Sequence, residues 1–133
     1  MEATRFRKQG RGELGALTLS YVIIVPVFLA AVMVIVQTSL WYLARQAALA
    51  AARQGVDAAR VLDAPLGAGQ SAALAFARSS ASGYLLAPSA TTAGSSLATV
   101  EVTVRGRVPS LVPGIVIKVR QVARAPVEQF TTP

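Results

Sequence analysis

The chain has 133 residues and a formal net charge of +7, and it contains no cysteine or histidine. These absences exclude disulfides, thiol nucleophiles, cysteine–histidine zinc sites and imidazole catalysis, so we expect no metal or other cofactor. The basic residues are spread along the chain without interleaved aromatic residues, which argues against nucleic-acid binding.

Residues 1–15 form a short basic leader. Two of its side chains are acidic, Glu2 and Glu13. Four are basic: Arg5, Arg7, Lys8 and Arg11. Lys and Arg accumulate on the cytoplasmic side of a first membrane span. We therefore expect a cytoplasmic N-terminus and an extracytoplasmic C-terminal region in a single-pass protein of the cell membrane.

The segment from Leu14 to Ala44 carries no formal charge, and Val22 to Val36 is almost purely aliphatic. A membrane-spanning helix needs roughly 20 apolar residues to cross a hydrocarbon core of about 30 Å. Trp41 and Tyr42 are suited to a membrane–water interface. We predict a transmembrane helix that ends near residue 42. A cleaved secretory signal is disfavoured, because its apolar region is only about 7–15 residues long.

The helical pattern continues beyond the span, and we expect one helix over residues 16–62. Small residues spaced four and three apart form a stripe, here called the packing stripe: Ala44, Ala48, Ala51, Gly55 and Ala58. Small side chains allow close backbone approach. The stripe could pack on helices of other subunits or on the chain's own C-terminal part. The alanines could also serve only as good helix formers.

Residues 63–133 are predicted to form a small α+β head. Apolar spacing indicates a helix over 70–86, followed by a small and polar loop up to Ser96. Alternating apolar residues then predict two strands, 98–107 and 115–122, that pair as a β-hairpin. Two strands are marginal in water, so we expect helices to cover one face.

Three details of this hairpin can be predicted. The alternation of apolar residues slips at Val122, so a bulge or strand end is expected near Arg120–Gln121. Pairing of Glu101 or Thr103 with Lys118 or Arg120 would favour the register. Leu111 and Val112, in the connection between the strands, are expected to fold back onto the sheet, with contact to a partner as the alternative.

The residues around Gly15 resemble the type IV pilin signature. Gly15 ends a basic leader, Ala16 follows, and Ser20, Tyr21 and Pro26 occupy positions of that motif. The match is closest to TadE-like proteins of tight-adherence (Tad/Flp) pilus systems in their actinobacterial form. It extends over most of the chain and is weakest over 62–96. It implies cleavage after Gly15 by a prepilin peptidase and a pilin-like fold with a long N-terminal helix.

One position departs from the family pattern. Ser20 stands where pilins usually carry a glutamate that is thought to meet the amine of a neighbouring subunit. A serine can hydrogen-bond to a backbone carbonyl of the preceding helical turn. Its transfer into hydrocarbon therefore costs much less free energy than that of a carboxylate. This favours a minor pilin or pseudopilin over a repeating shaft subunit.

The acidic residues are scattered and no serine has a histidine to activate it, so we expect no enzymatic activity. The resemblance implies membrane lipid, other Tad pilus subunits, the assembly platform and a prepilin peptidase as partners. Two alternatives remain open. The chain could be an uncleaved membrane-anchored protein with a partner-binding head, or a secreted domain released after about Ala44.

Overall fold

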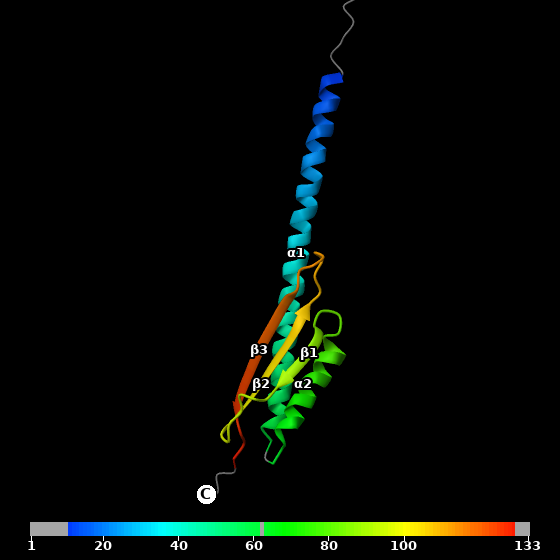
Figure 1. Cartoon of the computed structure of the whole chain (residues 1–133). Coiled ribbons are helices and arrows are strands. Elements are labelled where there is room, and N and C mark those ends of the chain that lie inside the picture. The colour runs from blue at the N-terminus through cyan, green and yellow to red at the C-terminus, as the bar shows by residue number, and fades with distance from the viewer. Residues whose placement is uncertain (1–10, 62, 130–133) are drawn as a thin grey trace, which may run out of the picture. The chain divides into compact units, whose positions relative to one another are not determined.

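The computed structural model describes the backbone of residues 11–61 and 63–129, and it gives the solvent exposure of Gly15 and of the described residues from Thr18 onward. The described elements are α1 (Arg11–Ala59), α2 (Leu66–Ser80), β1 (Leu86–Thr91), β2 (Thr99–Val108) and β3 (Ile117–Pro126) (Figure 1). The chain divides into two compact units, one ending at Val36 and the other beginning at Gln37. The architecture is α+β, as predicted, with a long apolar N-terminal helix.

The first unit contains the apolar part of α1. Every residue from Thr18 to Val36 is exposed. The helix continues through Pro26, whose ring removes one backbone donor from the helical hydrogen-bond series. The predicted leader lies mostly outside the described residues, and α1 already includes Arg11, before the expected helix start at residue 16.

The second unit contains a three-stranded antiparallel sheet in the order β1-β2-β3. Pairing between β2 and β3 is continuous, from Thr99 opposite Pro126 to Val108 opposite Ile117. The bulge expected near Arg120–Gln121 is therefore wrong. Val122 interrupts the alternation of apolar residues because it lies opposite Thr103 on the outer face of the sheet. An apolar residue fits there, since Thr103 and Glu101 on that face are buried.

The predicted cross-strand pairs are also wrong. Glu101 lies opposite Arg124, and Thr103 lies opposite Val122. The register is shifted because β3 runs on to Pro126, beyond the predicted end at residue 122. Glu101 is buried, and the Nε of Arg124 contacts its Oε2 at 2.5 Å.

The sequence-based prediction missed strand β1 and placed α2 too late. Helix α2 ends at Ser80 rather than residue 86, and β1 occupies the beginning of the expected loop. Pro88 lies in β1, where a register shift between Leu86 and Ser89 interrupts pairing with β2. Proline is tolerated in edge strands and at bulges, which is where this one lies.

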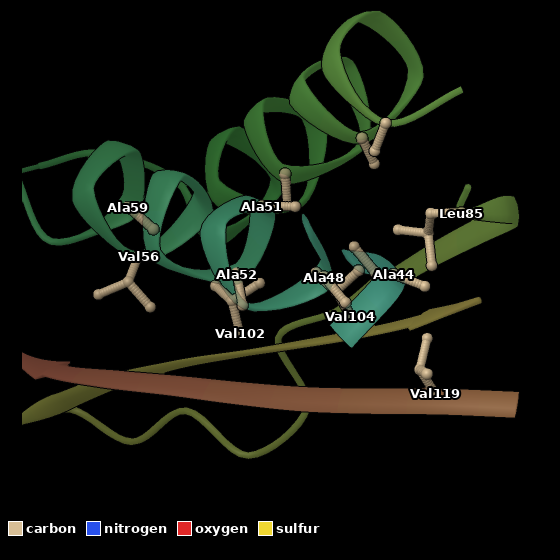
Figure 2. Close-up of a cluster of buried hydrophobic side chains, with 14 of the residues drawn as sticks. Ala44, Ala48, Ala51, Ala52, Val56, Ala59, Leu85, Val102, Val104 and Val119 are labelled. Atoms are coloured by element: carbon tan, nitrogen blue, oxygen red, sulfur yellow. The ribbon is translucent and has the colours of Figure 1, made fainter. Parts of the chain in front are cut away.

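The core is built mainly from small residues. Alanines of the outer part of α1 and of α2 pack over β2, whose inward-facing Val100, Val102 and Val104 are almost completely buried (Figure 2). Leu85, which directly precedes β1, is one of the largest fully buried side chains. Because alanine contributes little apolar area, the stability of this core depends on close approach of the backbones.

Candidate membrane-anchoring and assembly surfaces

The apolar part of α1 forms the first candidate surface. The exposed stretch Thr18–Val36 is about 28 Å long at 1.5 Å per residue, close to the thickness of a hydrocarbon core. It includes exposed Tyr21, Phe28 and Ile35, each about two-thirds accessible. A helix that exposes this much apolar surface is stabilised by an apolar environment. This helix is long and apolar enough to cross a membrane.

The residues of the predicted pilin motif all lie on this helix. Gly15 is exposed, and a Cβ built on it would have no neighbour within 4 Å. Ala16 is helical, and Ser20 and Tyr21 are exposed. Pro26 lies one and a half turns further along the same helix. Among the described residues, Gly15 therefore has no packing contact that would explain the glycine.

The packing stripe lies in the second unit, where the head itself covers most of it. Ala44, Ala48, Ala51 and Gly55 are buried, and Ala58 is half-buried. Ala52, Val56 and Ala59 are buried beside them. The chain's own α2 and sheet are therefore the partners of this part of α1.

Two glycines explain how α1 and α2 approach so closely. A Cβ on Gly55 would lie 2.6 Å from the carbonyl oxygen of Gly69 and 2.9 Å from Cβ of Ala73. A Cβ on Gly69 would lie 2.7 Å from the carbonyl oxygen of Gly55. Real Cβ atoms do not fit at such distances, so both positions require glycine at the observed separation. Sequence reasoning missed the packing role of Gly69, because the second helix was expected to begin only at residue 70.

The second candidate surface is the exposed end of the β2–β3 hairpin. Side chains that lie directly opposite each other across two strands share one face of the sheet. Arg105 lies opposite Arg120, and Arg107 lies opposite Lys118. All four side chains are exposed and line an open hollow of about 370 Å³. We call these residues the basic tetrad.

The hairpin connection, residues 109–116, is tied to α1 by one side chain. Gln37 Nε2 donates to the carbonyl oxygen of Pro109 at 3.1 Å, and Leu111 N–H donates to Gln37 Oε1 at 2.9 Å. Sequence reasoning missed this contact, because a lone glutamine at the end of an apolar run has no pattern. The basic tetrad could have been found from the sequence, because each strand carries two basic residues two positions apart, which places them on the same face of the sheet.

Within residues 11–61 and 63–129, no group of three or more acidic side chains is placed to hold a metal ion. The buried carboxylate of Glu101 is paired with Arg124, and its backbone exchanges two hydrogen bonds with Ser95 Oγ. These contacts give Glu101 a structural role at the start of β2.

Comparison with known proteins bears on the first surface. The family model described as TadE-like protein matches residues 15–57. This segment is TadE-like. The matched segment begins at Gly15, includes the apolar part of α1 and continues through most of the packing stripe. No curated protein and no solved structure matches the chain.

Proposed function

We propose that this chain is a minor pilin or pseudopilin that takes part in assembly of a Tad/Flp-type surface pilus. The observation that carries the proposal is the coincidence of the TadE-like match with an apolar helix that is exposed over the length of a bilayer. Before assembly, α1 holds the subunit in membrane lipid with its N-terminus in the cytoplasm and its head outside. A prepilin peptidase cuts after Gly15, leaving Ala16 as the first residue.

The same helix then serves as the packing element in the pilus or at its base. In lipid, the apolar side chains are already removed from water, so the hydrophobic effect does not drive helices together. Helix association there depends on close packing and polar contacts. Once the subunit leaves the bilayer, burial of exposed apolar residues from Thr18 to Val36 against other Tad subunits becomes favourable. The outer part of α1 is occupied by the chain's own head, which leaves the apolar part for neighbouring subunits and the assembly platform.

The burial of Ala44 disfavours a secreted form. This residue is completely buried in the core, and Gln37 and Leu40 before it are partly covered by the same head. Cleavage after about Ala44 would remove contacts from the head's own structure. Retention of the whole of α1 from Ala16 is consistent with this packing.

N-terminal sequencing of the native protein by mass spectrometry tests the proposal. A mature chain beginning at Ala16 supports it, and replacement of Gly15 by a bulky residue should then leave the leader attached. A chain beginning at Met1 would instead identify an uncleaved anchor with a partner-binding head. Piliation must also fall in a deletion strain, and normal piliation there would contradict a role in assembly.

A further inference from the structure

The connection between β2 and β3 presents an apolar surface to its surroundings. Its exposed aliphatic residues are between 40% and 60% accessible; they are Leu111, Val112, Ile115 and Val116. The prediction that Leu111 and Val112 fold back onto the sheet is wrong. Ser110 Oγ accepts a hydrogen bond from Val112 N–H and donates one to its carbonyl oxygen, and Gly114 turns the chain at φ +82°. The connection is thus an ordered tip with apolar side chains outward.

This tip is held at a defined point along the chain. Both hydrogen-bonding groups of the Gln37 side chain are used by its backbone. Gln37 directly follows Val36, the last residue of the exposed aliphatic stretch. Trp41 follows about 6 Å further along the helix axis, and Arg45 lies over its ring at 5.5 Å. The tip therefore lies beside Gln37, four residues before Trp41 on the same helix.

The basic tetrad begins where the tip ends. Arg107 is one residue before the end of β2, and Lys118 is one residue after the start of β3. Like charges directly opposite each other destabilise a strand pair. Among the described residues, no carboxylate lies within 4 Å of any tetrad side chain. Two repelling pairs around an open hollow would be stabilised by bound anions.

We propose that this end of the hairpin is a second membrane contact. The tip enters the interfacial region of the leaflet on the head's side, and the tetrad binds the phosphates of anionic phospholipids in that leaflet. An apolar loop flanked by cations combines the two attractions that hold proteins on anionic membranes. The contact fixes the orientation of the head above the bilayer and requires only that α1 is anchored there, whether or not the chain is processed.

A second copy of the chain fits this surface less well. Symmetric pairing of two such faces would bring four cations against four, with none of their charge neutralised. An anionic bilayer supplies phosphates to the tetrad and an apolar environment to the tip at the same time.

The absence of cysteine allows a direct test with single labels. The full chain carrying Val112→Cys is labelled with the environment-sensitive fluorophore NBD and placed, one chain per disc, in nanodiscs of POPC or of POPC with POPG. Leu97→Cys is the control, because Leu97 is 99% exposed and precedes β2 at the opposite end from the tip. In discs with POPG, the label at residue 112 should shift to the blue and be quenched by doxyl lipids, whereas the label at residue 97 should remain aqueous.

The contribution of the tetrad is tested in the same discs. Arg105→Gln with Arg120→Gln removes one repelling pair, so loss of folding is not expected, and thermal unfolding checks this. Arg53→Gln with Arg78→Gln removes equal charge from exposed helical positions. The tetrad variant should lose the POPG-dependent quenching at residue 112, and the helical variant should keep it.

Three results would overturn the proposal. The first is a label at residue 112 that is as aqueous as the one at residue 97 in both lipids. The second is equal quenching with and without POPG that is insensitive to the tetrad. The third is a blue shift that occurs only in discs holding two or more chains, which would assign the tip to a second copy.

Discussion

Replacing Gly69 by alanine tests the close contact between α1 and α2. The added Cβ would lie 2.7 Å from Cβ of Ala59 and 2.7 Å from the carbonyl oxygen of Gly55. Neither atom is the end of a flexible side chain, so α2 must move away from α1. Overpacking costs about 1–3 kcal/mol, and alanine gains about 1 kcal/mol over glycine in a helix interior. We expect a net loss of up to about 2 kcal/mol in the free energy of unfolding.

Gly67→Ala is the matched control, two residues earlier in the same helix. A Cβ at Gly67 would have no neighbour within 4 Å, so only the gain in helix propensity applies. Thermal unfolding of the full chain in detergent, followed by circular dichroism, measures both variants. For a domain of this size 1 kcal/mol corresponds to about 4–8 °C in Tm. Gly69→Ala should lower Tm by up to about 15 °C, and Gly67→Ala should leave it unchanged or slightly raised.

Gly55→Ala provides a second measurement of the same contact. It should also lower Tm, because its Cβ would meet the Gly69 carbonyl oxygen and Cγ1 of Val102. The double variant should cost less than the sum of the single ones, since one displacement of α2 relieves both clashes. A Tm for Gly69→Ala equal to or above that of Gly67→Ala would show that α1 and α2 do not meet at these glycines.

Two further predictions concern the sheet and its tip. Gln37→Ala should raise the hydrogen-exchange rate of the Leu111 amide, because that N–H loses its acceptor. Gln54→Ala, at an exposed position, should leave this rate unchanged. Equal Leu111 exchange rates in the two variants would contradict the contact between Gln37 and the hairpin connection. Arg124→Ala should lower the free energy of unfolding by about 1 kcal/mol, and with it Tm, because the buried carboxylate of Glu101 loses its partner. Arg120→Ala on the same strand should leave Tm unchanged or raise it, because it removes a like-charge repulsion, and a larger loss there would refute the register.

Several features of the fold could be predicted because they depend on neighbours in the sequence. An uncharged aliphatic run of sufficient length specifies a membrane helix, and alternation of Val100, Val102 and Val104 specifies a strand. The small residues at spacings of three and four predicted which side of α1 packs, though not its partner. Strand β1 escaped prediction because Pro88 and the surrounding small polar residues match a loop until β2 supplies a pairing partner.

The sequence alone determined the long apolar helix and the two long strands, and it predicted a pilin-like motif at Gly15. The tertiary structure decided the strand register, the enclosure of the packing stripe by the chain's own head and the exposure of the β2–β3 tip. The reason is the range of the interactions. Helix and strand periodicities act over a few residues, whereas the Gly55–Gly69 approach, the Glu101–Arg124 pair and the Gln37 tether join residues 14, 23 and about 70 positions apart.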